Sequence, residues 1–353
     1  MARGSIGASD KLRHFRVSAE RPAATAIDIA ARAIKSGGLV AFPTETVYGL
    51  GADAWSESAV DKIFRAKGRP ATDPLIAHLA DVAQLADLAR DVPDSALELC
   101  RRFWPGALTL VLLKSARVPA NLTAGLDTVA LRMPDHAVAA ALIEAAGIPI
   151  AAPSANRFSR PSPTTAQHVL DDLADDIDVL LDAGPTTIGL ESTIISLVDD
   201  PPQLLRPGGV PLEALRRLIP DLRFEPRFLH DAEAAPAPGT LLKHYSPRAK
   251  LLLFQGADDA AVFAAMRAEI GGDRRVGLML SDADAAAFAD LDVEIERLGA
   301  NAEQAALRLF AAMRALDRAG VDLILALAPE ERGLGLAIRD RLLRAAEGSV
   351  IDV

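Results

Sequence analysis

The spacing of short apolar segments limits what this chain can fold into, and it changes once along the sequence. Up to about residue 235 the segments are broken irregularly by proline, glycine, serine and threonine. Several of them read as strands: residues 38–43, 108–113, 128–133, 148–154, 178–183 and 192–198. Helical patterns lie between only some of these and end at Gly37, Gly68 and Gly147, the second beginning at a capping Ser58. Because strands and helices do not alternate strictly, we predict a mixed α+β sheet.

From about residue 249 the pattern becomes regular. Predicted helices at 258–270, 301–319 and 335–346 alternate with predicted strands at 250–255, 274–280, 293–298 and 321–328. Such alternation is typical of βα units, so we expect a small Rossmann-like parallel α/β domain. The segment AAPAPG between the two patterns reads as an extended linker. We therefore predict a first domain over residues 20–231, a linker over 232–248 and a second domain over 249–353.

Composition excludes several classes of protein. The 353 residues are 50% hydrophobic and 24% charged, which is far from a disordered composition. The formal net charge of −10 argues against extensive nucleic-acid binding, because phosphates require a basic surface. The single Cys100 excludes a disulfide scaffold and a four-cysteine zinc site. No apolar run approaches the roughly 20 residues of a spanning helix, and the first residues lack a signal-peptide pattern, so we expect a soluble cytoplasmic protein.

Four polar clusters follow apolar segments of the first domain. The first is FPTETVYGLGADA, residues 42–54. If this segment is extended, Thr44, Thr46 and Tyr48 share one face, and Glu45 and Val47 share the other. Two hydroxyls and a phenol next to glycines suit contact with a ligand. A threonine-rich strand entering a turn is an equally good interpretation of the spacing.

The second cluster is KGRPATDPLIAHL, residues 67–79. Pro70 disfavours a helix at Arg69, and an extended Lys-x-Arg directs Lys67 and Arg69 to the same side, as a polyphosphate requires. A solvated basic loop is the simpler interpretation of any isolated Lys-x-Arg. His78 follows in an apolar strand, where a single histidine is more often a core residue than a ligand.

The remaining clusters are AAPSANRFSRPSPTT (151–165) and the pair DAGPTTIGLESTIISL (182–197) and LLRPGG (204–209). Ser154 and Asn156 leave an apolar strand on one face, although a surface loop would have the same composition. Ser192 and Arg206 offer a hydroxyl and a fixed cation, and Arg132 ends another strand. Each cluster alone is weak evidence. Several arginines at strand ends in an acidic domain indicate a pocket for phosphates and a carboxylate.

Taken in order, these motifs resemble those of the YrdC-like family. The resemblance rests on FPTETVYGLGADA, KGRPATDPLIAHL, FWPGALTLVL, TVALRMP, PIAAPSANRFSRPSPTT, GLESTI and LLRPGG. A following PGTLLKHYSPR and a second α/β domain make the chain similar to the two-domain form. The resemblance implies a twisted open sheet with helices around a cationic cavity. It further implies a nucleotidyltransferase that converts L-threonine, bicarbonate and ATP, with Mg²⁺ accompanying ATP, into threonylcarbamoyl-AMP and pyrophosphate. Downstream proteins then transfer the threonylcarbamoyl group to tRNA next to the anticodon.

The resemblance also implies roles for individual residues. The family's threonine pocket falls on Thr46, His78, Arg132, Ala152 and Ser192. Its nucleotide contacts fall on Lys67, Arg69, Asp73, Thr128, Ser154, Asn156, Ser162, Arg206 and Tyr245. Lys67 and Arg69 are the expected catalytic cations at the triphosphate, and Tyr245 lies in a linker that is expected to cover the cavity. The family often has asparagine where this chain has Asp73, which as a carboxylate would face the ribose or a magnesium ion.

The expected chemistry requires no protein nucleophile. The threonine amine attacks CO2 or bicarbonate, and the carbamate attacks the α-phosphorus of ATP, with His78 a candidate base. Positioning and charge neutralisation would supply most of the catalysis. The alternatives are an RNA-binding module that uses the cationic cavity without turnover, and a nucleotide-dependent regulator. The net charge of −10 and the 4% aromatic content argue against RNA binding, so we expect no strong direct contact with nucleic acid.

Overall fold

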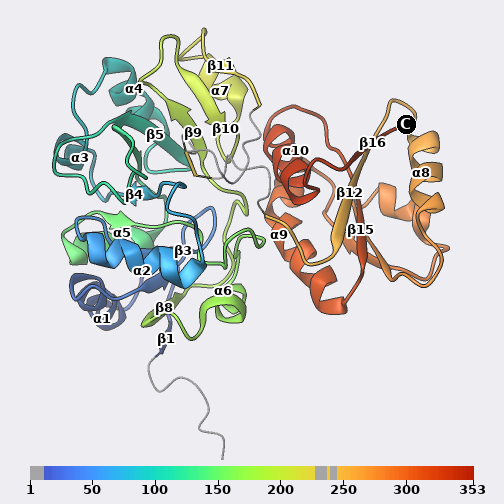
Figure 1. Cartoon of the computed structure of the whole chain (residues 1–353), viewed down its shortest axis with the longest axis horizontal. Helices are drawn as coiled ribbons and strands as arrows, with labels where there is room; N and C mark the ends of the chain where they lie inside the picture. The colour runs from blue at the N-terminus through green and yellow to red at the C-terminus, as the bar shows by residue number, and fades with distance from the viewer. Residues whose placement is uncertain (1–11, 227–236, 239–244) are drawn as a thin grey trace, which may run out of the picture.

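The computed structural model describes residues 12–226, 237–238 and 245–353 (Figure 1). Most of the linker predicted at 232–248 lies outside the described residues. None of the helices within these ranges is long and apolar enough to cross a membrane.

One long, mixed sheet organises the N-terminal part of the chain. Its strand order is β1-β8-β2-β3-β7-β4-β6-β5-β9-β10-β11, with both parallel and antiparallel neighbours. The bounds of the strands are β1 (Arg13–Arg16), β2 (Val40–Phe42), β3 (Gly49–Asp53), β4 (Ile76–His78), β5 (Leu108–Leu113), β6 (Thr128–Arg132), β7 (Ile150–Ala151), β8 (Val179–Asp182), β9 (Thr193–Ser196), β10 (Gln203–Arg206) and β11 (Arg223–Phe224). The predicted mixed α/β architecture is therefore confirmed.

Helices cover both faces of this sheet. On one face α1 and α5 pack together over β2, β7 and β8, and on the other α2, α4 and α6 cover the central strands. The helix bounds are α1 (Ala24–Lys35), α2 (Glu57–Lys67), α3 (Leu85–Leu88), α4 (Asp94–Phe103), α5 (Ala137–Ala146), α6 (Ala166–Leu173) and α7 (Leu212–Arg216). Gly68 and Gly147 adopt the left-handed conformation that ends α2 and α5, as the sequence predicts. The predicted N-cap Ser58 is wrong, because Ser56 accepts the capping hydrogen bond from the Ala59 amide.

The C-terminal part is a parallel sheet with alternating helices, which confirms the predicted βα pattern. Its strand order is β14-β13-β15-β12-β16, and every pair is parallel. The elements are β12 (Lys250–Gln255), α8 (Asp259–Ala268), β13 (Val276–Leu280), β14 (Glu294–Arg297), α9 (Ala302–Ala319), β15 (Leu323–Leu327), α10 (Leu334–Ala345) and β16 (Val350–Asp352). Helices α9 and α10 lie between this sheet and the N-terminal part (Figure 1).

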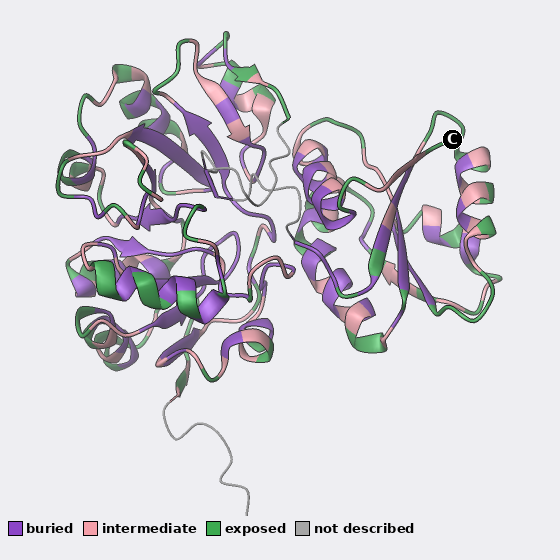
Figure 2. Cartoon of the chain, in the orientation of Figure 1, coloured by how far each residue is buried: buried purple, intermediate pink, exposed green. Residues whose placement is uncertain are grey.

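The two parts share a buried interface. Val47, Leu190 and Tyr245 belong to the same apolar cluster as the inner faces of α9 and α10. A Cβ added at Gly189 would lie 2.5 Å from the Ala306 carbonyl oxygen, so the loop before β9 approaches α9 backbone to backbone. The helix surfaces on this side are largely buried (Figure 2). The C-terminal part therefore packs directly against loops that, as described next, form the candidate site.

Candidate active site

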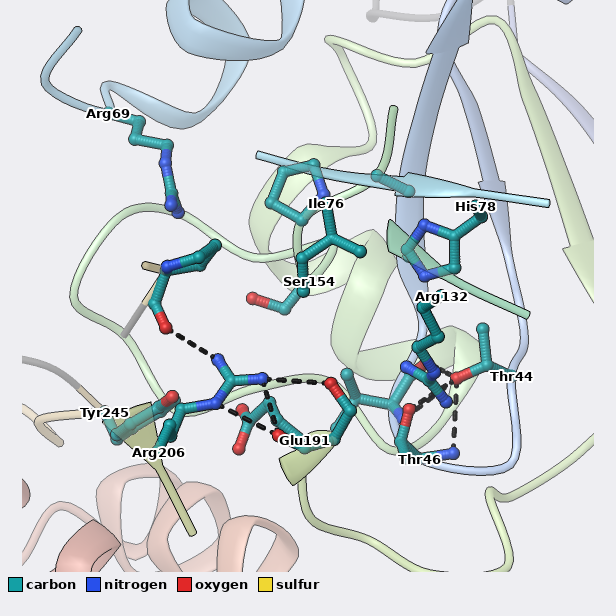
Figure 3. Close-up of a pocket in the computed structure, with 16 residues that line it drawn as sticks. Thr44, Thr46, Arg69, Ile76, His78, Arg132, Ser154, Glu191, Arg206 and Tyr245 are labelled. Atoms are coloured by element: carbon teal, nitrogen blue, oxygen red, sulfur yellow. Dashed lines mark hydrogen bonds between the residues drawn. The ribbon is translucent and has the colours of Figure 1, made fainter. Parts of the chain in front are cut away.

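A cavity lies where β4, β6 and β10 end and where the loops after β2 and β7 meet the loop before β9 (Figure 3). It is lined by Thr44, Thr46, Val47, Gly49, Arg69, Ile76, His78, Arg132, Ala152, Pro153, Ser154, Glu191, Ser192, Arg206, Pro238 and Tyr245. The structure thus brings together all of the residues expected in the threonine pocket. Of the expected nucleotide contacts it brings Arg69, Ser154, Arg206 and Tyr245 to the same cavity.

Arg132 is fixed at the floor of the cavity by the sheet. It is the last residue of β6, in register with His78 on the parallel strand β4. Its Nη2 lies 2.6 Å from Glu45 Oε1 and its Nε donates to the Gly106 carbonyl at 3.2 Å. Both members of the ion pair are less than a tenth exposed. A buried guanidinium held in this way is pre-oriented to receive a carboxylate.

His78 remains neutral at this site. Burial, and secondarily the charge of Arg132, lowers the pKa of His78 to about 3. A neutral imidazole can donate and accept hydrogen bonds at a bound amino acid. A group with so low a pKa is a weak base near neutral pH. The structure therefore argues against the expectation that His78 is the general base.

The segment around Thr46 is a turn, so the alternating faces expected for an extended segment are wrong. The Thr44 hydroxyl donates to the Val47 carbonyl at 2.7 Å and lies 2.7 Å from the Thr46 hydroxyl. Tyr48 is outside the cavity, and its hydroxyl donates to the Gly184 carbonyl at 2.6 Å. The turn also directs Glu45 back toward Arg132. Threonine hydroxyls compete with the backbone for such local bonds, which favours a turn over a strand.

Arg69 reaches the other side of the cavity and is supported from behind by Asp73. The Arg69 Nη2 lies 2.8 Å from Asp73 Oδ1 and donates to the Pro74 carbonyl at 2.8 Å, and Nε donates to the Asp73 carbonyl at 3.1 Å. Asp73 is fully buried and is not among the lining residues. The Asp73 carboxylate thus orients Arg69, whereas its expected contact with the nucleotide stays a prediction.

Lys67 lies behind the cavity wall. Its Nζ donates to the carbonyls of Ser154 and Asn156, each at 2.6 Å, and burial lowers its pKa well below the usual lysine value. The Asn156 amide in turn donates to the carbonyls of Arg157 and Arg160 at 2.8 Å. Lys67 and Asn156 therefore hold the loop that carries Ser154 in place. The expected contact between Lys67 and the triphosphate stays a prediction.

Ser192 and Arg206 are held together by a network of hydrogen bonds. Arg206 Nη2 donates to the Ser192 carbonyl at 2.9 Å and its Nη1 donates to the Pro238 carbonyl at 2.9 Å. The Ser192 hydroxyl lies 2.7 Å from that of Thr109 on β5. A Cβ at Gly208 would lie 2.4 Å from backbone atoms of Glu191, Ser192 and Thr193, so only glycine permits this approach of the two loops. The glycines in LLRPGG thus have a structural reason.

Two other expected nucleotide contacts, Thr128 and Ser162, are not among the lining residues. Thr128 begins β6, opposite Leu113 at the end of the strand far from Arg132. Ser162 donates to Glu191 Oε1 at 2.5 Å. Glu191 itself lines the cavity and was missed from the sequence, as was Glu45. The glutamates inside the motifs TETVYG and GLESTI were the only sequence signal for these two residues. A carboxylate is not expected in a site for anions unless the arginine that neutralises it is known.

The part of the chain that the structure describes contains no group of three or more histidine, cysteine, aspartate or glutamate side chains that could hold a metal ion. Glu191 is the one carboxylate among the described lining residues, and it is paired with Arg341 at 2.8 Å. The site therefore does not fit a dedicated metal centre. Mg²⁺ commonly binds through substrate phosphates and waters, so a nucleotide could bring its own ion.

Fold and cavity define a class: an α/β protein with an arginine-lined pocket for anionic ligands. Comparison with known proteins narrows this class. The family model Sua5_yciO_yrdC, described as "Telomere recombination", matches residues 32–208, and the model Sua5_C, described as "Threonylcarbamoyl-AMP synthase, C-terminal domain", matches residues 210–347. The chain belongs to this two-domain Sua5/YrdC family, as its motifs predict.

Relatives and solved structures match along nearly the whole chain. Threonylcarbamoyl-AMP synthase of Pyrococcus abyssi is 48% identical over 337 residues, covering 93% of this chain and 96% of the relative. The Bacillus subtilis protein of the same name is 45% identical, covering 91% of this chain and 93% of the relative. The crystal structure of P. abyssi Sua5 complexed with L-threonine has a TM-score of 0.88 and 46% identity, and covers 97% of this chain and 99% of that one.

Proposed function

We propose that the chain is a threonylcarbamoyl-AMP synthase, which makes threonylcarbamoyl-AMP and pyrophosphate from L-threonine, CO2 or bicarbonate, and ATP. The observation that carries the proposal is the convergence of Arg132, Thr46, His78 and Ser192 on one cavity with Arg69 and Arg206. The threonine-bound P. abyssi structure shares this fold along 97% of the chain, which supports an amino acid as one ligand.

L-threonine and ATP would bind on opposite sides of the cavity. Arg132 would take the threonine carboxylate, while His78 and the hydroxyls of Thr46 and Ser192 would hold the amino group and side chain. Arg69 and Arg206, with Ser154 between the two sides, would take the phosphates of ATP. Lys67 would act on the triphosphate chiefly through the Ser154 loop, whose carbonyls it binds.

The reaction needs positioning more than covalent catalysis. The threonine nitrogen forms a C–N bond with CO2 and loses a proton to give a carbamate. A carbamate oxygen then forms a bond to the α-phosphorus, and the bond from that phosphorus to the bridging oxygen breaks, so that pyrophosphate leaves. Fixed arginines at the phosphates would stabilise this departing charge. A neutral His78 can orient the amine but is too weakly basic to remove its proton efficiently.

Magnesium would enter this site with ATP, held by the phosphates, because the described residues offer no ligand set of their own. When bound, the ion would neutralise phosphate charge. Pro238 and Tyr245, two described residues of the predicted linker, line the cavity and would help to exclude water from the labile products. We place the enzyme in the cytoplasm, where it would supply proteins that transfer the threonylcarbamoyl group to tRNA.

Pyrophosphate release tests the proposal. We expect release from ATP to require L-threonine, bicarbonate and magnesium together, and to fall by about 100-fold or more when Arg69 is replaced by alanine, since the mutation removes a charged contact at the phosphates. Lys67→Ala should also lower release by displacing the Ser154 loop. Release that does not depend on threonine, or salt-sensitive RNA binding without turnover, would instead favour the regulator or the RNA-binding module.

A further inference from the structure

Arg341 of helix α10 extends from the C-terminal domain into the wall of the candidate site. Its side chain is completely buried. Its Nε donates to Glu191 Oε2 at 2.8 Å, and its Nη1 donates to the Pro207 carbonyl at 3.0 Å and to Asp340 Oδ2 at 2.7 Å. The guanidinium carbon lies 5.1 Å from the centroid of the Tyr245 ring. One side chain thus contacts three segments that surround the cavity.

The contacts of Arg341 are with parts of the site itself. Glu191 and Tyr245 both line the cavity, and Pro207 directly follows Arg206. The second oxygen of Glu191 accepts a hydrogen bond from Ser162 at 2.5 Å. Both carboxylate oxygens of Glu191 are therefore engaged, one of them by a residue from the other domain. This arrangement holds the Glu191 side chain and the adjoining Ser192 in one position.

Tyr245 is held by the same domain. Its backbone has a φ of 62°, a left-handed conformation that is unfavourable for a non-glycine residue and persists only where the surroundings enforce it. Its ring stacks at 5.4 Å on Phe310 of α9 and lies near the charge of Arg341. Two helices of the C-terminal domain therefore fix the ring that forms one side of the cavity.

The charge of Glu191 shows why an arginine is needed there. Among the described lining residues Glu191 is the one carboxylate, and the cavity must receive the phosphates of a nucleotide. Unpaired, this buried charge would repel an anionic ligand and would attract Arg206, whose charge also interacts with those of Glu191 and Arg341. Pairing with Arg341 removes this competition, so Arg206 keeps the orientation set by its bonds to the Ser192 and Pro238 carbonyls.

We infer that Arg341 is a positioning residue of the active site: it neutralises Glu191 and fixes Tyr245 and the Pro207 loop, so that the C-terminal domain completes the anion pocket. The inference rests on the proposed function for the identity of the anion, ATP. It gives the C-terminal domain a role in substrate binding that the βα pattern alone does not suggest.

Calorimetric titration with MgATP separates charge positioning from simple packing. In the full chain, Arg341→Met keeps the length of the side chain and leaves Glu191 unpaired, so we expect the affinity for MgATP to fall at least about 10-fold. Adding Glu191→Gln removes the stranded charge, and the affinity should return to within about threefold of the wild type. A residue that only packs would leave the double variant as impaired as the single one, and that result would overturn the inference.

Arg314 provides a matched control. It is a buried arginine on α9 at the same interface. Its Nη2 pairs with Asp172 at 2.6 Å and donates to the Pro161 carbonyl at 2.5 Å, and none of these three residues lines the cavity. Arg314→Met should lower the melting temperature about as much as Arg341→Met and leave the affinity for MgATP within about twofold of the wild type. An equal loss of affinity in both variants would show a general effect of interface damage and would refute the specific role of Arg341.

The same titrations distinguish this inference from the proposed function. If MgATP affinity follows the expected pattern but pyrophosphate release does not depend on threonine, the proposed function fails and the role of Arg341 stands. If release depends on threonine while Arg341→Met binds and turns over MgATP normally, only the role of Arg341 fails. A wild-type chain that does not bind MgATP would contradict both.

Discussion

Arg132 offers the sharpest test of how the site recognises an amino acid. Replacing Arg132 by methionine removes the proposed partner of the threonine carboxylate, but it also strands Glu45, which lies 2.6 Å from the guanidinium and is itself buried. The informative change is therefore the double variant Arg132→Met with Glu45→Gln. It removes both charges together and keeps a neutral polar side chain at position 45.

The magnitudes separate folding from binding. Breaking a buried ion pair by removing one partner costs about 3–5 kcal/mol, so Arg132→Met alone should be strongly destabilised. Removing both charges should return most of that stability. Loss of a charge-assisted contact to the ligand carboxylate costs about 1.5–3 kcal/mol, with a further contribution when the contact is bidentate. The double variant should therefore fold and bind L-threonine roughly 10- to 150-fold more weakly than the wild type.

Isothermal titration calorimetry with L-threonine and with L-threoninol, which has no carboxylate, measures the relevant difference. The wild type should prefer L-threonine strongly. The double variant should bind L-threoninol within about threefold of the wild type and lose the preference for L-threonine, because only the carboxylate contact has been removed. If the two ligands lose affinity equally, Arg132 acts on the shape of the pocket, and our assignment of the carboxylate is wrong.

Two further predictions concern stability. Burial lowers the pKa of His78 to about 3 and of His168 to about 4, so the unfolded chain binds more protons than the folded chain below pH 6.5. This contribution to stability is complete above about pH 6.5 and is lost as the pH falls toward these values, by up to about 1.4 kcal/mol per pH unit for each histidine. In His168→Gln the free energy of unfolding, measured with urea at several pH values, should therefore fall less steeply with decreasing pH than in the wild type. An unchanged dependence of this free energy on pH would contradict the burial argument. Gly208→Ala places a Cβ 2.4 Å from the backbone of Glu191 and Ser192, so we expect unfolding to become easier by about 1–3 kcal/mol and L-threonine affinity to fall; a wild-type melting temperature would show that the loops can separate without cost.

Local patterns in the sequence predict the elements well where residues within the segment determine its conformation. The helices that end at Gly68 and Gly147, and the alternation after residue 249, need no information from elsewhere in the chain. Strand β3 contains Gly49 and Gly51 and has little strand character by itself. One reason for its glycines is Phe42 of the neighbouring strand, which packs where their side chains would otherwise be, at 2.8 Å from a Cβ added at Gly51. That cause is a contact between strands, which the segment alone does not show.

The ion pairs of the candidate site likewise depend on contacts between distant segments, which the sequence alone does not show. The motifs predict the arginines, but they do not predict which acids hold them, because Glu45 and Arg132 are 87 residues apart and Glu191 and Arg341 are 150 apart. For this reason Glu45, Glu191 and Arg341 were missed. The structure places the Asp73 carboxylate against Arg69, and its expected contact with the nucleotide stays a prediction.

These pairings determine how the arginines of the pocket recognise an anion. Arg69 and Arg132 each have a buried carboxylate partner, and the N–H groups of Arg206 are directed to the carbonyls of Ser192 and Pro238. The arginines are therefore held in fixed orientations before any ligand arrives, so little side-chain entropy is lost when an anion binds. The paired acids also reduce the net positive charge of the site, which makes recognition depend on the geometry of fixed N–H groups rather than on bulk attraction. A site of this kind should discriminate between anions by shape, and it is compatible with a chain whose net charge is −10.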